Sequence, residues 1–122
     1  MEYNSLPYAD ALARRLLDII ADWDADDTPP NLGSLQNMLQ FLVAHPKLPK
    51  PRIYADDLGE FTIEWGSFHE SSNVIITFSR AGAPWLVMYK DGMRYRMKKY
   101  SRKSALMKWL KKLKIVTIPE HT

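Results

Sequence analysis

The sequence contains no cysteine, little glycine and no long apolar run. Without cysteine there are no disulfides, no thiolate nucleophiles and no cysteine-ligated zinc. Only five of the 122 residues are glycine, and neither a phosphate-cradling glycine loop nor a dinucleotide fingerprint is present. The apolar runs are too short for a transmembrane helix, and the N-terminus lacks the apolar segment of a secretory signal. We therefore expect a cytoplasmic protein that makes no membrane contact.

The sequence also lacks a recognisable catalytic or metal-binding group of side chains. His45, His69 and His121 are far apart, and none has a partner at ligand spacing. Glu60 and Glu64 share one face of a predicted strand and could hold a base or a cation, but a solvated sheet face is the favoured interpretation. We accordingly predict no catalytic residue, no metal, no cofactor and no enzymatic activity.

The composition is that of an ordinary globular protein. Hydrophobic residues make up 46% of the chain and charged residues 25%. A length of 122 residues predicts a single domain over residues 1–122.

Charge is distributed unevenly along the chain. Residues 1–45 contain seven acidic and two basic residues, a balance of −5, whereas residues 90–114 contain eleven Lys or Arg against only Asp91, a balance of +10. Such asymmetry indicates a partner surface at one end or both, or two solvated faces that attract each other within the fold.

Two helices are predicted in the N-terminal half. Residues 6–23 have apolar side chains at helical spacing, and Ser5 is a candidate N-cap. That apolar set is Ala9, Leu12, Ala13, Leu16, Ile19, Ile20 and Trp23. A second helix is predicted over residues 32–44, capped by Asn31 or Ser34 and followed by a proline-rich connector.

From residue 52 onward the apolar period changes to two. Strands are predicted over residues 52–55, 60–65, 73–79, 85–90 and 93–100, with a hairpin turn at Asp91-Gly92. In the last strand the alternation places Tyr95 on the apolar, core-facing side and Arg94, Arg96 and Lys98 on the other.

Ser101 is a candidate cap for a final helix whose polar side is rich in lysine. The order of elements predicts an α+β fold: two N-terminal helices, an antiparallel meander of four or five strands, and a C-terminal helix packed on one sheet face.

The aspartate cluster in ADWDADDTPP comprises Asp22, Asp24, Asp26 and Asp27. A helix–loop–helix calcium site needs glycine at loop position 6 and glutamate at position 12. A loop that starts at Asp22 places Asp27 and Gly33 there, and one that starts at Asp24 places Pro29 at position 6. The aspartates are better interpreted as the solvated end of a helix and as an acidic surface.

The basic segment is the strongest indication of function. Its cations could neutralise phosphates or meet an acidic protein, and its tyrosines could stack on bases, although lysine-rich helix faces often only solvate a protein. The candidate residues for contact with a partner or nucleic acid are Lys90, Arg94, Arg96, Lys98, Lys99, Tyr100, Arg102, Lys103, Lys108, Lys111 and Lys112.

Several short motifs together resemble a loosely defined group of small bacterial and phage-borne accessory proteins, over roughly residues 16–90. The motifs are Trp23-Asp24, Pro29-Pro30, Pro51-Arg52-Ile53 and Gly59-Glu60-Phe61-Thr62-Ile63-Glu64-Trp65. Ala25 departs from the glycine associated with the first motif. The resemblance implies an α+β fold and a mobile or accessory genome, where such groups act as antitoxins, immunity proteins or inhibitors, and it transfers no catalytic residue.

Two functional hypotheses follow. The first is a non-enzymatic protein that binds another macromolecule, as an antitoxin-like or anti-defence inhibitor whose protein partner could be a toxin or a nucleic-acid enzyme. The alternative is direct nucleic-acid binding through residues 90–114. The oligomeric state does not follow from the sequence.

Overall fold

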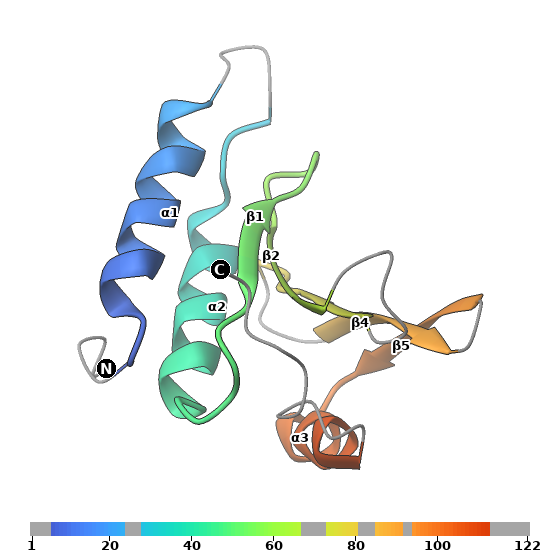
Figure 1. The fold of residues 1–122 in the computed structure, drawn as a ribbon. Helices are drawn as coiled ribbons and strands as arrows, with labels where there is room; N and C mark the ends of the chain where they lie inside the picture. The colour runs from blue at the N-terminus through green and yellow to red at the C-terminus, as the bar shows by residue number, and fades with distance from the viewer. Residues whose placement is uncertain (1–5, 24–27, 67–72, 81–84, 92–93, 113–122) are drawn as a thin grey trace.

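The described residues form three helices and a five-stranded antiparallel sheet (Figure 1). The computed structural model describes residues 6–23, 28–66, 73–80, 85–91 and 94–112. The elements in chain order are α1 (Ala9–Ala21), α2 (Leu32–Ala44), β1 (Arg52–Ala55), β2 (Phe61–Gly66), β3 (Asn73–Thr77), β4 (Trp85–Asp91), β5 (Arg94–Tyr100) and α3 (Lys103–Lys112). This confirms the predicted α+β fold.

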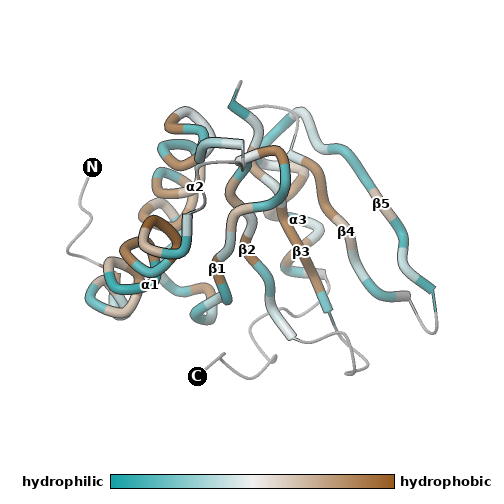
Figure 2. The backbone as a smooth tube through the Cα atoms, turned by 90° about the horizontal axis from the view of Figure 1, so that it is seen from above, coloured by the Kyte–Doolittle hydropathy of each residue, from teal (hydrophilic) through white to brown (hydrophobic). Residues whose placement is uncertain are grey.

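The sheet is a simple meander in which each strand pairs with the next, in the order β1-β2-β3-β4-β5. Asp91 pairs with Arg94, so β4 and β5 form the hairpin that the sequence predicts. The strands β1 and β5 form the two edges. Figure 2 looks onto the sheet with α3 behind it and β5 as the outermost strand.

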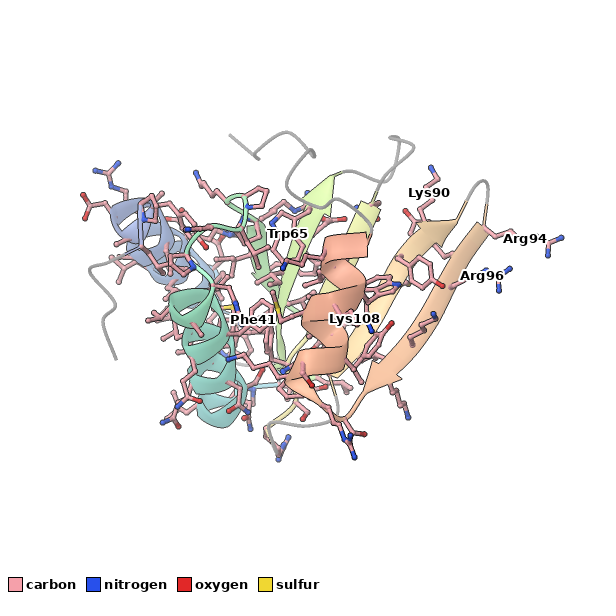
Figure 3. The ribbon with its side chains drawn as sticks, turned by 90° about the horizontal axis from the view of Figure 1, so that it is seen from below. Phe41, Trp65, Lys90, Arg94, Arg96 and Lys108 are labelled. Carbon is pink, nitrogen blue, oxygen red and sulfur yellow. The ribbon has the colours of Figure 1, made fainter. Side chains whose placement is uncertain are left out.

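The core lies between the sheet and the helices. Figure 3 views this side, with α3 in front of the strands, α2 beside them, and Phe41 and Trp65 between the two helices. Both side chains are buried, as are Leu106 and Leu110 of α3 and Leu12 of α1. All three helices and β1 to β4 therefore contribute to one hydrophobic core.

The first helix differs from its prediction at its start and on one flank. It begins at Ala9 with Tyr8 at the N-cap, which makes no side-chain cap bond, so the prediction of a Ser5 cap was wrong. Ile20, predicted to face the core, is 61% exposed. Adjacent helical residues point about 100° apart, and the neighbouring Ile19 takes the buried position.

The second helix is joined to the sheet through its first turn. Asn31 is the cap, because its side chain accepts a hydrogen bond from the Ser34 N–H at 2.9 Å. The other cap candidate, Ser34, is fully buried instead. Its hydroxyl donates to the Phe78 carbonyl and accepts from the Phe61 N–H at 2.7 Å, which fixes α2 against β2 and the end of β3.

The third helix begins at Lys103, so Arg102 rather than Ser101 precedes its first turn and the prediction of a Ser101 cap was wrong. It packs beneath β4 and β5 (Figure 1). Its position is set by Leu106 and Leu110, one helical turn apart and both fully buried.

Candidate macromolecule-binding surface

The edge strand β5 presents a row of three cations. Arg94, Arg96 and Lys98 are exposed, and each pairs with the β4 residue directly opposite, the last two with Tyr89 and Val87. Because Val87 is fully buried against the helices, the three cations lie on the helix side of the sheet. Same-face residues of a strand are about 6.7 Å apart, so these residues, called here the basic row, extend over roughly 13 Å. Figure 3 shows Arg94 and Arg96 directed away from the body of the protein.

Three aromatic rings lie beside the basic row. The Trp109 ring of α3 contacts Tyr89 at 4.8 Å and Tyr100 at 5.7 Å between centroids. Lys98 Nζ lies 5.8 Å from the centroid of the Tyr89 ring, within cation–π range. Burial raises the pKa of Tyr100. The half-buried rings therefore hold α3 against the hairpin and form the inner wall of the basic surface.

Four of the remaining predicted cations are not gathered into this surface. Lys99 pairs with Leu86 and Lys90 with Tyr95, so both lie on the sheet face opposite the helices. In α3, Lys103 and Lys111 follow the stripe of Met107 at spacings of four, turned away from Trp109. Arg102 and Lys108 are exposed, and the side chain of Lys112 lies outside the described residues.

Of the acidic cluster, only Asp22 lies in the described part of the structure. It is exposed at the C-cap of α1, while Asp24, Asp26 and Asp27 lie outside the described residues. Because α1 packs against β1 and the basic row is on β5, Asp22 and the basic row lie at opposite sides of the sheet (Figure 1). Mutual attraction within the fold therefore does not explain the position of either.

Asp22 borders one of two adjoining cavities between α1 and β1. The first has a volume of about 420 Å³, is lined also by Asp56 and Asp57, and shares Arg15 and Tyr54 with a second cavity of about 400 Å³. Arg15 Nε donates to the Ile53 carbonyl of β1 at 2.6 Å. Asp56 is occupied by its own turn, since its Oδ1 accepts from the N–H groups of Leu58 and Glu60 at 2.9 Å. Arg15 and Asp56 therefore have structural partners.

The expectation that Glu64 belongs to a solvated sheet face was wrong. The residue is only 8% exposed. Arg52 Nε lies 3.4 Å from one of its carboxylate oxygens, and Asn73 donates to the other at 2.9 Å. The Tyr95 hydroxyl in turn donates to Asn73 Oδ1 at 2.9 Å. The carboxylate is thus held in a network that joins β1, β2, β3 and β5, and such satisfied polar networks make a sheet rigid.

The same contact corrects the prediction for Tyr95. This residue lies on the face opposite the helices, where burial and the negative charge of Glu64 raise the pKa of its hydroxyl. It is therefore no part of the hydrophobic core. Sequence reasoning missed the network because its members come together only once the register of four strands is known.

His45 is the one histidine within the described residues, since His69 and His121 lie outside them. It is the C-cap of α2, and its ring lies 5.1 Å from that of Phe41. Burial, and then the positive charge of Lys103 in α3, lower the pKa of His45 from its ordinary value of 6.5. In the part of the chain described, no three His, Asp or Glu side chains meet as a metal site would require.

The lowered pKa predicts a pH-dependent stability. Below about pH 6.5 the unfolded chain protonates His45 while the folded protein still resists protonation, so stability falls as pH decreases toward the folded-state pKa. Replacing His45 with phenylalanine should reduce the difference in unfolding free energy between about pH 7.5 and about pH 5. Urea denaturation of both chains measures this, because His69 and His121 contribute equally to each. An unchanged difference would contradict the prediction.

Comparisons with protein-family models, with curated proteins and with solved structures give no match for this chain. The resemblance to phage-borne accessory proteins therefore stays a hypothesis that rests on the quoted motifs. Among the described helices, none combines the length and apolar character needed to cross a membrane.

Proposed function

We propose that this chain is a non-enzymatic binding protein that docks onto an acidic surface of a protein partner through the basic row of β5. The observation that carries the proposal is the row itself: Arg94, Arg96 and Lys98 lie on one face of an edge strand and are all exposed. Rows of like charge steer association and select partners of opposite charge. Of the acidic surface, Asp22 is exposed at the end of α1, and Asp24, Asp26 and Asp27 lie outside the described residues.

An inhibitory role, as an antitoxin-like or anti-defence protein of a mobile element, is the biological setting that we propose for this binding. It rests on the motif resemblance and on the absence of a catalytic constellation in the sequence. The basic row is compatible with it, because a small inhibitor needs only a surface complementary to its target.

The simpler explanation of the basic row is protection of a sheet edge. Natural proteins place lysine and other charges on edge strands to prevent pairing between copies. Protection alone predicts that replacing these cations changes self-association but no binding to another molecule. The two explanations are therefore separated by experiment.

The decisive variant replaces Arg94, Arg96 and Lys98 with alanine. Exposed ion pairs contribute about 0.2–1 kcal/mol each, so losing three should lower the affinity for an acidic protein partner roughly 3- to 150-fold. Tagged wild-type chain is used to recover a stoichiometric partner from its native host, and the affinity of both chains for that partner is then measured. The matched control replaces Arg14, Lys47 and Arg80, which are exposed elsewhere on the protein and remove the same charge. Equal affinities for all three chains would contradict the proposal.

Nucleic-acid binding is the second candidate, and the rings of Tyr89, Tyr100 and Trp109 beside the basic row favour it. An oligothymidylate serves as the probe. Binding that weakens with salt, with a log–log slope that drops by about 2 when three phosphate-contacting cations are removed, would support this candidate. A probe that does not bind at low salt would exclude it and leave the protein partner.

A further inference from the structure

The outer edge of β5 is the second feature with functional potential. The backbone of Phe61 faces β3, since its carbonyl accepts from the Phe78 N–H at 3.0 Å. Along an antiparallel strand, successive residues direct their backbone N–H and C=O groups alternately toward one neighbouring strand and toward the other. Because the paired residues are known from β2 to β5, the direction at Phe61 determines the direction at each residue of β5. Arg96 and Lys98 therefore direct their backbone groups toward β4. Met97 and Lys99 direct theirs away from the sheet.

The two edges of the sheet are treated differently. On β1 the same alternation turns Ile53 outward, and its carbonyl is covered by Arg15 of α1 at 2.6 Å. On β5 no described strand or helix lies beyond the edge (Figure 2). Met97, in the middle of the strand, is 62% exposed. A seven-residue strand in unbroken register thus presents outward-directed backbone groups, which is the geometry that accepts an added strand.

The side chains of β5 limit which strand can be added. A second copy of β5 would bring Arg94, Arg96 and Lys98 against the same cations, and like charges in cross-strand positions are destabilising. An acidic strand would pair with them instead. On the opposite face Met97 continues a cross-strand row with Met88 and Ile75, which favours apolar residues in the added strand.

We propose that β5 receives an extended segment of the protein partner, with alternating acidic and apolar residues, as a sixth strand of the sheet. The inference rests on the proposed function, since it specifies how a protein partner is bound. Backbone hydrogen bonds to Met97 and Lys99 supply the alignment. The basic row selects acidic residues on the helix side, and Met97 contacts apolar residues on the other.

The protein-side test replaces Met97 with proline. Because the Met97 N–H points away from β4, proline removes an edge donor without removing a hydrogen bond of the existing sheet. Replacement with threonine, which favours strands and keeps the N–H, is the matched control. Both variants keep all charges of the basic row.

The probe is a synthetic peptide of alternating glutamate and valine, as long as β5, with a fluorescent label. We expect binding to the wild-type chain and to Met97→Thr, with a loss of at least about tenfold in Met97→Pro. Methylating the peptide's backbone nitrogens should cause a similar loss in the wild-type chain, which keeps the test valid if the proline variant does not fold. Amide exchange at Met97 and Lys99 should slow when the unmodified peptide binds.

The outcomes separate this inference from the proposed function. If replacing the basic row weakens binding while Met97→Pro and the methylated peptide bind as well as their controls, charge docking stands and strand addition is wrong. If replacing the basic row changes the affinity for neither the peptide nor the host partner, the proposed function itself fails. Binding of the oligothymidylate but not of the peptide would likewise overturn strand addition.

Discussion

Replacing Gly59 with alanine is expected to destabilise the protein by about 2–4 kcal/mol. Gly59 has φ +77°, a left-handed conformation that alanine rarely adopts. An added Cβ would lie 2.2 Å from the Pro29 carbonyl oxygen. That segment cannot move away easily, because the Asn31 N–H donates to the Gly59 carbonyl at 2.7 Å and Asn31 caps α2. Urea denaturation of both chains measures the change in unfolding free energy.

The control for this prediction is Gly66→Ala. Gly66 has a positive φ of similar size, +75°. The left-handed conformation alone costs a non-glycine residue about 1–2 kcal/mol. A loss at Gly59 beyond this cost reports the close approach of Pro29. If the two variants lose the same free energy, the approach of the two loops does not restrict this position.

The alternation of apolar residues was sufficient to predict the strands and most of their faces. Phe61, Ile63 and Trp65 all point into the core as predicted. Alternation predicted too little burial on the other face, where Thr62 and Glu64 are also buried. Strand β2 lies inside the sheet with neighbours on both sides, and neighbouring side chains cover polar residues that a single sequence segment shows as solvated.

The error in the face predicted for Tyr95 has a different cause. The prediction followed the apolar residues of β5 by themselves. Across a hairpin with a two-residue loop, paired residues are an odd number of positions apart, and the two members of a pair point to the same face of the sheet. Val87 and Tyr89 therefore share their face with their partners Lys98 and Arg96. Tyr95 then lies on the opposite face. The Asp91-Gly92 turn in the sequence therefore already indicated the correct face. At an edge strand the turn is the better guide to the face than the apolar residues, because little of that strand is buried.

The composition of residues 90–114 predicted a basic surface, but it did not predict which of the residues lie together on it. The sequence groups eleven candidate residues, whereas the fold places the basic row on one face and Lys90 and Lys99 on the other. Whether successive cations form one surface depends on strand register and helix rotation. Neither can be read from charge alone.

The remaining prediction with a large effect concerns Trp65. Its side chain is 1% exposed, so replacement with alanine should cost about 3–5 kcal/mol through lost burial and a residual cavity. Its Nε1 also donates to the Pro49 carbonyl at 2.7 Å, which ties the proline connector after α2 to the sheet. Trp65→Phe keeps an aromatic ring but leaves that carbonyl without its donor, for an expected loss of about 1–3 kcal/mol. An unfolding free energy for Trp65→Phe equal to that of the wild-type chain would contradict the role of the hydrogen bond.

Trp65→Phe also tests the proposed function, because stability and binding should separate. Trp65 lies in β2, with β3 and β4 between it and the basic row. Its replacement should lower the unfolding free energy and leave the affinity for the partner unchanged at temperatures where the chain is folded. Replacing Arg94, Arg96 and Lys98 should do the reverse, since these exposed side chains contribute little to stability. If affinity follows stability across both variants, the lost binding reflects unfolding, and the basic row has no specific role as a docking surface.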